Sequence, residues 1–292
     1  MNSLDEFKQI VESYYKEHKR DLPWRKTSNP YHIVVSEIML QQTQVPRVII
    51  KYTEFIKTFS TWESLANATF AEVLEKWSGL GYNRRAKYIH LIAQKVVNEF
   101  HGILPDDPTI LETFPGIGKA TAASIVVYSF NKPIAFIETN VRRVFIHHFF
   151  KDKLPQGHPN GKFASRLARS REGIDDTKRI HDKELEPFVE SSIDQTNPKE
   201  WYWALMDYGT YLATQIENPN RKSKHYAKQS KFEGSVRKVR GEILRQLLKY
   251  KTLTEKQIDI LDEDKIKVKA AINGLIQDRL IKKTKTDIIV LF

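Results

Sequence analysis

The sequence predicts an all-α protein with a small C-terminal module. Helical periodicity recurs through most of the 292 residues, short turns containing Gly or Pro separate the periodic segments, and strand-like alternation is nearly missing until the last dozen residues. We expect helices over residues 4–19, 32–40, 44–59, 64–76, 84–100, 119–130, 140–150, 182–194 and 198–215.

Composition restricts the function. The formal net charge is +11 and the sequence pI about 9.5, which favours an anionic partner, most commonly nucleic acid. No run of about 18 apolar residues is present, so we expect no membrane span and a cytoplasmic, nucleoid-associated protein. Cysteine is absent, which excludes disulfides, thiolate metal sites and cysteine-bound iron–sulfur clusters.

Two segments interrupt the helical pattern. Residues 152–180 are rich in Gly, Pro, Arg and Asp, and we interpret them as an exposed insertion. Residues 217–235 form a polar, basic linker that we expect to lie on a phosphate backbone through Arg221, Lys222 and Lys224.

The pattern of secondary structure predicted for residues 233–292 differs from that of residues 1–232, so we predict a boundary between two domains there. A basic helix over 236–250, a short helix from "TLTEKQID", a helix over 264–278 and a terminal hairpin are typical of a winged-helix module. A small helical cap packed on the main domain is the alternative.

A hairpin between helices is predicted by "LETFPGIGKATAASIVVYSF", residues 111–130. Gly116 and Gly118 allow a tight turn that approaches a ligand closely, and the next helix directs its free N–H groups at that turn, near Lys119 and Thr121. The motif predicts a helix–hairpin–helix that grips DNA backbone. An ordinary joint between two helices is the alternative.

An acid stands in the apolar stretch "PYHIVVSEIMLQQTQVPRV", residues 30–48. Partial burial would let Glu37 hold a proton near neutrality, as a general acid must. Gln41 and Gln42 follow at the helix end, and planar amides suit insertion between bases. The alternative is an acid on a solvated helix edge.

A glycine-flanked turn lies in "WSGLGYNRRAKYIH", residues 77–90. Leu80 and Tyr82 could enter a base step while Arg84 and Arg85 hold the phosphates. Core packing of Leu80 and Tyr82 is the alternative.

A second carboxylate, Glu138, ends the apolar run in "KPIAFIETNVRRVF", residues 132–145. A carboxylate beside an apolar run tends to have a perturbed pKa or a partner. The alternative is that Glu138 or Thr139 simply caps a helix that begins near Asn140.

Taken in order, these motifs resemble the helix–hairpin–helix (HhH-GPD) base-excision glycosylases, and most of all the MutY-type A/G-specific adenine glycosylases. "LPWR", "SEIMLQQTQV", "LANA", "GLGYNRRAK", "PGIGKATA", "NVRRV" and "ALMDYG" follow the family's order and spacing over roughly residues 5–217. The resemblance implies a two-lobed helical fold and double-stranded DNA with a mispair or lesion as partner.

The resemblance also implies roles for individual residues. Glu37 would protonate the departing base, Glu138 would stabilise or attack the sugar, and Asn140 would help to hold the site. The residues that would line the base pocket are Trp24, Arg25, Ala120 and Asp207. The residues that would contact or probe the DNA are Gln41, Gln42, Leu80, Tyr82, Arg84, Arg85, Gly116, Gly118, Lys119, Thr121, Arg142, Arg143, Arg221, Lys222 and Lys224.

The chain departs from the family pattern at several positions. Glu138 stands where the family has Asp, and Asn83 replaces a second tyrosine. Ala120 stands where bifunctional relatives such as endonuclease III carry a Schiff-base lysine, so we expect no strand cleavage by that route. The four cluster cysteines are gone from the remnant loop, residues 213–231, and residues 233–292 are too few for the domain that recognises 8-oxoguanine.

We therefore expect a monomeric, monofunctional DNA glycosylase that flips out and excises a mispaired purine, with adenine as the leading substrate. A glycosylase for mispaired thymine or uracil or for a damaged base, and a catalytically weak protein that binds distorted DNA, are the alternatives. We expect no metal and no iron–sulfur cofactor. The carbonyls of the hairpin, residues 114–119, could bind a monovalent cation.

Overall fold

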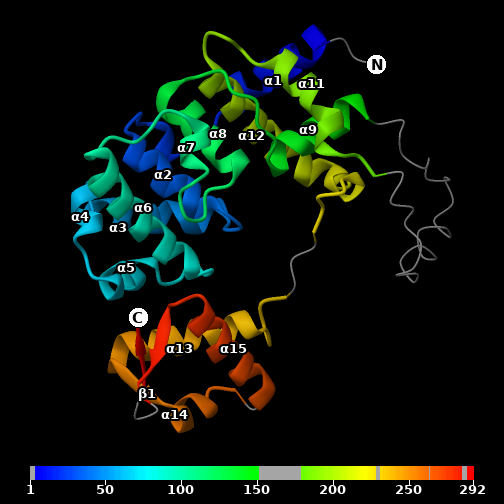
Figure 1. Ribbon diagram of the computed structural model, residues 1–292. Helices are drawn as coiled ribbons and strands as arrows, with labels where there is room; N and C mark the ends of the chain where they lie inside the picture. The colour runs from blue at the N-terminus through cyan, green and yellow to red at the C-terminus, as the bar shows by residue number, and fades with distance from the viewer. Residues whose placement is uncertain (1–3, 151–178, 228–230, 263, 285–287) are drawn as a thin grey trace, which may run out of the picture. The chain divides into compact units, whose positions relative to one another are not determined.

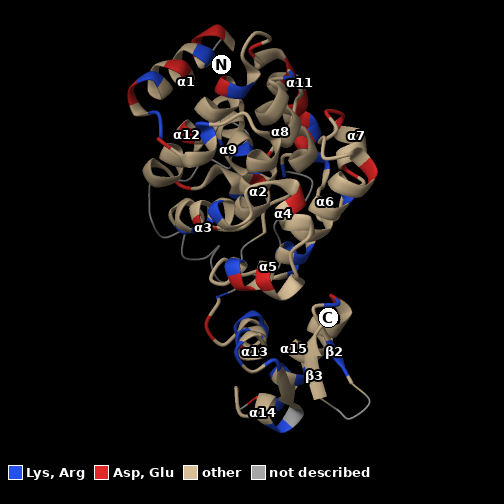
Figure 2. Cartoon of the chain, turned by 90° about the vertical axis from the view of Figure 1, so that its left-hand side faces the viewer, with Lys and Arg blue, Asp and Glu red and all other residues tan. Residues whose placement is uncertain are grey.

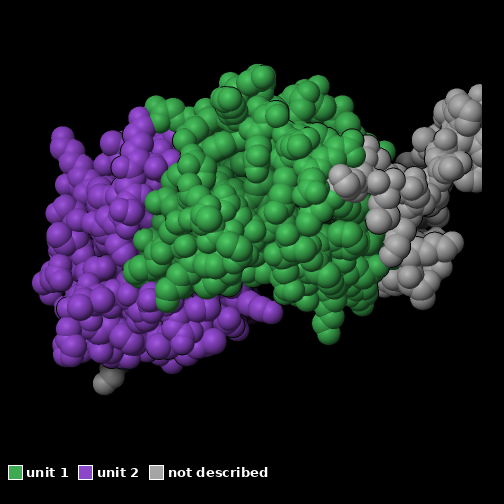
Figure 3. All heavy atoms as spheres, turned by 90° about the horizontal axis from the view of Figure 1, so that it is seen from above, with its two compact units in different colours: residues 1–21, 126–228 green, residues 22–125, 229–292 purple. Residues whose placement is uncertain are grey.

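The computed structural model describes residues 4–150, 179–227, 231–262, 264–284 and 288–292. The chain divides into two compact units (Figure 3): unit 1 combines residues 1–21 with 126–228, and unit 2 combines residues 22–125 with 229–292. Each unit is therefore discontinuous in sequence. The expected insertion at 152–180 lies almost wholly outside the described residues, and the division into domains at residue 232 stays a prediction.

Short and medium-length helices make up most of residues 22–125 (Figure 1). They are η1 (Pro23–Arg25), α2 (Pro30–Leu40), α3 (Val45–Thr58), α4 (Trp62–Ala66), α5 (Phe70–Trp77), α6 (Arg84–Phe100), α7 (Pro108–Leu111) and the first part of α8 (Lys119–Phe130).

The single helix expected over 64–76 is wrong, because the chain forms α4 and α5 there. Thr69 explains the break. Its hydroxyl accepts a hydrogen bond from the Glu72 backbone N–H, and the Glu72 carboxylate accepts one from the Thr69 N–H at 2.7 Å. This reciprocal cap starts a new helix, and the spacing T-x-x-E already carries the signal.

Helix α2 is buried on almost every side. Seven of its residues are no more than 2% exposed: Tyr31, Ile33, Val34, Val35, Ser36, Ile38 and Met39. The helix begins with Pro30 in its first turn, after Asn29, whose side chain accepts a hydrogen bond from the Tyr31 N–H at 2.9 Å. A helix that is apolar all round belongs in a core, and Glu37 is its one acidic residue.

The turn between α7 and α8 has the sharp geometry that the glycines predict. Gly116 has φ +77°, and a Cβ there would lie 2.2 Å from Cδ2 of Tyr88. The position therefore requires glycine for both backbone conformation and space. Gly118 has open space around its Cα. Helix α8 follows at once, with Ala122 and Ala123 buried.

Unit 1 contains α1 (Leu4–His18), α9 (Thr139–Phe149), α11 (Asp182–Ser192), α12 (Pro198–Gln215) and η4 (Pro219–Lys222). Its core is aromatic: the Phe7 ring lies 5.0 Å from Phe145 and 6.0 Å from Trp201, measured between ring centroids. These edge and tilted contacts bury large apolar areas and fix α1 on α9 and α12.

The segment that follows α12 is held by hydrogen bonds. The buried Asn220 donates from Nδ2 to the carbonyl of Thr139 at 2.9 Å, and Ser223 pairs with Ile180 in a parallel bridge. The contact with Thr139 joins this loop to the first turn of α9.

The C-terminal residues form a compact helical and stranded module. Its elements are α13 (Val236–Tyr250), β1 (Thr252–Thr254), α14 (Glu255–Asp259), α15 (Lys265–Gln277), β2 (Ile281–Lys283) and β3 (Ile288–Leu291). The strands pair antiparallel in the order β1-β3-β2. The helices and the final hairpin agree with the expected layout, and β1 was not expected.

Basic residues recur along α13, where the ribbon is coloured blue (Figure 2). They are Arg237, Lys238, Arg240, Arg245 and Lys249. Among the described residues, no helix is long and apolar enough to cross a membrane.

Gly209 allows α12 to approach α9 closely. A Cβ at Gly209 would lie 2.7 Å from the Asn140 Cβ and 2.9 Å from its carbonyl oxygen. We expect Gly209→Ala to lower the free energy of unfolding by about 2 kcal/mol in urea titrations, because neither helix can give way without cost.

Gly241→Ala is the matched control, since Gly241 also lies inside a helix but has nothing near its Cα. It should raise the free energy of unfolding by about 0.5–1 kcal/mol. Equal stability of the two variants would contradict the close-packing explanation.

Candidate active site and nucleic-acid interface

Glu37 lies on α2, half-buried and within reach of α8. Its Oε2 is 2.5 Å from the hydroxyl oxygen of Ser124, a residue only 4% exposed. The expectation that Glu37 sits on a largely apolar helix is confirmed. A carboxyl held in place there, short of full solvation, has the surroundings that a general acid needs.

Glu138 lies in unit 1 as the N-cap of α9. Its Oε1 accepts hydrogen bonds from the backbone N–H groups of Asn140 at 2.5 Å and Val141 at 3.0 Å. The capping alternative is thus an observed feature of Glu138. Burial raises the pKa of the Glu138 carboxyl, against the two N–H groups and the positive charges of Arg142 and Arg143, which lower it.

Asn140 and Arg143 tie this end of α9 to α12. Arg143 donates from Nη1 to the Asn140 Oδ1 at 2.6 Å and to the Gly209 carbonyl at 2.7 Å. The Asn140 Nδ2 lies 3.7 Å from the Met206 sulfur. The network fixes the orientation of the amide that the resemblance assigns to the site.

The residues expected to line a base pocket occupy different surroundings. Trp24 is 5% exposed and packs edge-on against Tyr52 at 5.5 Å, while Arg25 and Ala120 are half-buried. Asp207 is 2% exposed and accepts from Arg20 Nε at 2.5 Å and from its backbone N–H at 3.0 Å. Asp207 therefore carries a structural ion pair within unit 1.

Arg85 is the first of three arginines for which the expectation of a phosphate contact is wrong. It is 6% exposed, and burial lowers its pKa to about 10. Its Nη1 donates to the carbonyls of Ile38, Met39 and Gln41 at 2.6–2.9 Å, and its Nη2 donates to Thr43 Oγ1 at 2.8 Å. The guanidinium binds backbone and is not available to DNA.

Arg142 and Arg143 are likewise turned inward. Arg142 forms a two-pronged ion pair with Asp182, Nε to Oδ1 at 2.7 Å and Nη2 to Oδ2 at 2.6 Å. Arg143 is 9% exposed and serves the network around Asn140. Both side chains hold α9 within unit 1, because hydrogen bonds from a charged guanidinium to carboxylate and carbonyl oxygens are strong.

The glycine-flanked turn supports the packing alternative for one residue. Leu80 is 2% exposed and belongs to the core, so the expected apolar tip is wrong for this structure. Tyr82 is half-buried with φ +47°, and its hydroxyl accepts a hydrogen bond from Arg237 at 2.6 Å. Arg237 and Arg85 also lie over the Tyr82 ring at 5.5 and 5.4 Å.

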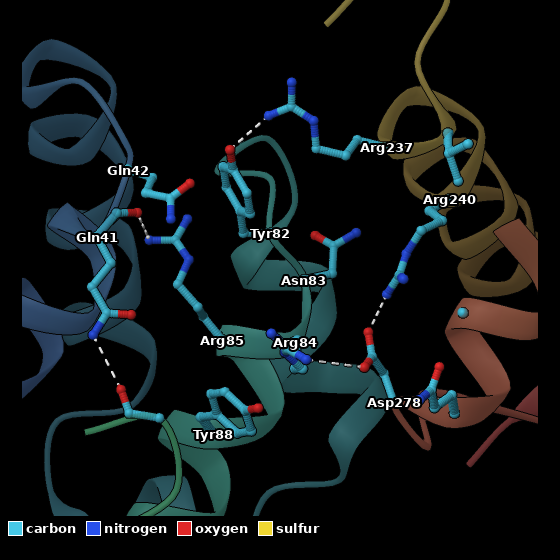
Figure 4. Close-up of a pocket in the computed structure, with 14 residues that line it drawn as sticks. Gln41, Gln42, Tyr82, Asn83, Arg84, Arg85, Tyr88, Arg237, Arg240 and Asp278 are labelled. Carbon is cyan, nitrogen blue, oxygen red and sulfur yellow. Dashed lines mark hydrogen bonds and ion pairs between the residues drawn. The ribbon is translucent and has the colours of Figure 1, made fainter. Parts of the chain in front are cut away.

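Several of the expected DNA contacts gather around one pocket of about 730 Å³ in unit 2 (Figure 4). They are Gln41, Gln42, Tyr82, Arg84, Gly116 and the largely buried Arg85. The Gln41 side chain lies along the hairpin, where its Nε2 donates to the Gly116 carbonyl at 3.2 Å. The structure thus brings the glutamines, the turn and the hairpin to one place.

The pocket is also lined by residues that the sequence did not single out. The C-terminal module contributes Arg237, Arg240 and Asp278, and Asp278 pairs with both Arg84, at 3.3 Å, and Arg240. The i, i+3 spacing of the two arginines on the basic helix was the available signal. Ser124 was also missed, and its signal is a lone hydroxyl in the buried stretch "AASIVV".

The other expected phosphate contacts lie at the surface. Gly118, Lys119, Arg221 and Lys224 are exposed, whereas Thr121 and Lys222 are half-buried. Arg221 pairs with Glu217 at 2.7 Å, and burial lowers the pKa of Lys222. Lys228, a fourth cation of this loop, is outside the described residues.

No cluster of three His, Asp or Glu side chains suited to a metal occurs among the described residues. In the hairpin, the Gly116 carbonyl already accepts from Gln41 and the Phe114 carbonyl from the Ile117 N–H at 3.2 Å. Two of the oxygens that a monovalent cation would use are thus engaged, and that cation stays a prediction.

The chain matches the model of the HhH-GPD superfamily of base excision DNA repair proteins over residues 35–164. Over these residues, which are fewer than half of the chain, the sequence is similar to the HhH-GPD superfamily. The matched residues run from α2 through the hairpin and include the whole of α9. They include Glu37, Ser124 and Glu138.

Curated relatives within this superfamily are adenine DNA glycosylases. The one from Buchnera aphidicola subsp. Baizongia pistaciae is 38% identical over 149 residues, covering 51% of this chain and 42% of the relative. The one from Rattus norvegicus is 33% identical over 218 residues, covering 71% and 38%. The chain spans about two fifths of the length of these relatives.

A solved thermostable thymine-DNA glycosylase has the same fold, with a TM-score of 0.58 over 76% of this chain and 92% of that chain. Its sequence identity to this chain is 23%. The predicted helical fold is thereby confirmed.

The buried position of Arg85 predicts a large cost for its removal. We expect Arg85→Met to lower the free energy of unfolding by about 3 kcal/mol, because three carbonyls at the end of α2 lose their donor. Arg84→Met, next in the chain and paired with Asp278 in a largely exposed bridge, should cost about 1 kcal/mol or less. Equal losses in urea unfolding would contradict this assignment.

The raised pKa of Glu138 predicts a pH-dependent stability. The folded protein keeps this proton to a higher pH than the unfolded chain, so the stability from this group is full below its ordinary pKa of 4.5 and is lost as pH rises through the raised value. We expect Glu138→Gln to be as stable as the wild type or more so at pH 8, because the amide oxygen still accepts both N–H groups.

Glu72→Gln is the control of opposite sign. Hydrogen bonds from Thr69 lower the pKa of Glu72, so its contribution is present above the ordinary pKa and is lost on acidification. This variant should lose stability at pH 8. Urea unfolding at pH 5 and pH 8 measures both. A Glu138→Gln protein that is less stable at pH 8 would contradict the burial argument.

Proposed function

We propose that this protein is a monofunctional DNA glycosylase that flips adenine out of a mispair and hydrolyses its N-glycosidic bond. The observation that carries the proposal is the carboxyl of Glu37, set on a buried helix and held by Ser124 in a chain whose curated relatives are adenine DNA glycosylases. Bond cleavage of this kind needs a proton donor for the base and a negative charge for the sugar.

The roles of the two carboxyl groups follow from this chemistry. Glu37 gives its proton to a nitrogen of the base, so that the base leaves neutral. Glu138 offsets the positive charge that develops on the sugar as the bond breaks, and its raised pKa comes from burial, which also strengthens such an interaction. Water then completes the hydrolysis.

The partner is double-stranded DNA with a mispair, bound by a monomer. The glycine turn of the hairpin and the N-terminus of α8 suit a phosphate, and Gln42 and Tyr82 border the same pocket. The module adds affinity through basic residues such as Lys282 and Lys283, a task for a winged-helix-like unit. Its low content of base-reading side chains favours a general grip over base selection.

We further propose that no iron–sulfur cluster is bound and that no strand is cleaved by a Schiff base. The sequence has no cysteine, and Asn220 holds its loop to the carbonyl of Thr139, so the residues present do not fit a cysteine-ligated cluster. Ala120 offers no amine to the sugar. Hydrolysis is then the only outcome at the sugar.

Glu37→Gln tests the acid role. We expect release of base to fall at least 100-fold while DNA affinity stays within about threefold, because the amide keeps the shape of the acid but has no proton to give. Glu75→Gln, an exposed acid on α5, is the control and should match the wild type. The measurements are single-turnover base release and fluorescence anisotropy on the same duplex.

A panel of duplexes distinguishes the substrate. Adenine opposite guanine or 8-oxoguanine, thymine or uracil opposite guanine, and a matched duplex are each incubated with the protein and scored with and without alkali. Adenine release that requires alkali to cut the strand supports the proposal. Release of thymine or uracil alone, strand cleavage without alkali, or binding without any release would each replace it.

A further inference from the structure

The hydroxyl of Ser124 faces two oxygen atoms. It lies 2.5 Å from Oε2 of Glu37 and 3.0 Å from the backbone carbonyl of Thr121, three residues earlier in α8. Both distances are within hydrogen-bond range, and the first falls in the range of charge-assisted bonds between oxygens. Ser124 is 4% exposed, so solvent competes little for these contacts.

A serine hydroxyl has one hydrogen and two acceptor positions, whereas a carbonyl only accepts. If the Ser124 hydrogen points to the Thr121 carbonyl, the Glu37 carboxyl must supply the hydrogen between Oε2 and Oγ and is then in its acid form. If Glu37 is a carboxylate, the Ser124 hydrogen turns to Oε2. One rotation of the hydroxyl thus serves both protonation states of Glu37 without moving a heavy atom.

From this geometry, and resting on the proposed function, we propose that Ser124 is a positioning residue for Glu37. It holds Oε2 at one place before and after the proton leaves, and it sets how readily the proton is given up. In the step itself the O–H bond of Glu37 breaks and the proton moves to a nitrogen of the base. The Ser124 hydroxyl keeps its hydrogen and turns to donate a hydrogen bond to the carboxylate that is left.

The direction of the effect follows from the strengths of the two bonds. A hydrogen bond to a charged acceptor is about twice as strong as one between neutral groups. Ser124 therefore favours the carboxylate form more than the acid form. Without its hydroxyl, Glu37 should hold its proton to a higher pH and should occupy more than one orientation.

Other charged groups near α2 are the same in every variant compared. The elements packed against α2 include η1, α3 and α6, which carry Arg25, Tyr52 and Arg85 among other charged groups. Helix α8, which carries Ser124 itself and Lys119, also contacts α2. Arg85 binds the carbonyls of Ile38 and Met39 at the end of α2, and burial raises the pKa of Tyr52 to about 12. A difference between variants at position 124 therefore reports on the hydroxyl alone.

The decisive measurement is the titration of the Glu37 carboxyl in the full-length protein. Side-chain ¹³C-labelled glutamate gives one signal per residue, and Glu37→Gln identifies the signal of Glu37. We expect Ser124→Ala to move its midpoint up by roughly 0.5–1 pH unit, equivalent to the loss of one hydrogen bond. In Ser124→Cys, whose side chain is similar in size to serine but a weak hydrogen-bond donor, the Glu37 midpoint should lie between those of the wild type and Ser124→Ala.

Ser129→Ala is the matched control. Ser129 is in the same helix, and its buried hydroxyl oxygen has no hydrogen-bond partner among the described residues. It should leave the titration of Glu37 unchanged. A midpoint that is the same in Ser124→Ala and the wild type would overturn the inference, as would an equal shift in Ser129→Ala.

Activity then separates the inference from the proposed function. With a duplex that the wild type cleaves, Ser124→Ala should lower the single-turnover rate about tenfold at neutral pH and move the high-pH fall of the rate upward, while DNA affinity is kept. A shifted titration in a protein that releases no base would support the positioning role and reject the glycosylase. If Ser124→Ala releases base with the same rate and pH profile as the wild type, the glycosylase proposal is supported and the positioning role of Ser124 is rejected.

Discussion

The buried guanidinium of Arg85 connects α2, the helix that carries Glu37, to the glycine-flanked turn that carries Tyr82. The last carbonyls of any α-helix lack partners inside the helix, and at the end of α2 Arg85 supplies the donors. The same group reaches the Gly81 carbonyl at 3.2 Å. Burying a charge is costly unless it is fully bonded. The segments bound to Arg85 must therefore keep a single arrangement, which holds Glu37 and Tyr82 in fixed surroundings within unit 2.

Much of this architecture could be predicted from sequence because it depends on local rules. Periodicity predicted the bounds of α6, α8 and α12 to the residue. Gly116 predicted a tight turn, and its positive φ and the lack of room for a Cβ both require glycine there. The break at Thr69 was also readable from its capping spacing. Strand β1 was not predicted, because three residues are too few to show an alternating apolar and polar pattern.

The partners of charged side chains could not be read in the same way. Arg85 and Arg142 look like DNA contacts in a run of basic residues. Arg85, however, donates to the carbonyls at the end of α2 and Arg142 to the Asp182 carboxylate, partners that lie 40 or more positions away in sequence. Ser124 and Glu37 are 87 positions apart. Such pairs are created by the fold, and no window along one chain contains both members. Glu138 shows the converse: its cap and its proposed chemistry use the same carboxyl, so the two sequence interpretations do not exclude each other.

The discontinuity of unit 1 has a consequence for how the chain reaches its native state during synthesis. α1 is made before its partners in α9 and α12: Tyr15 of α1 donates a hydrogen bond to Glu200 of α12, 185 positions later in the sequence. Residues 22–125 form a contiguous helical segment that can acquire its core while α1 still waits. Closing the long loop between α1 and α12 costs conformational entropy, and such non-local contacts form slowly. Until α9 and α12 have left the ribosome, the apolar face of α1, with Phe7 and Val11, lacks the native surfaces that cover it in the folded protein.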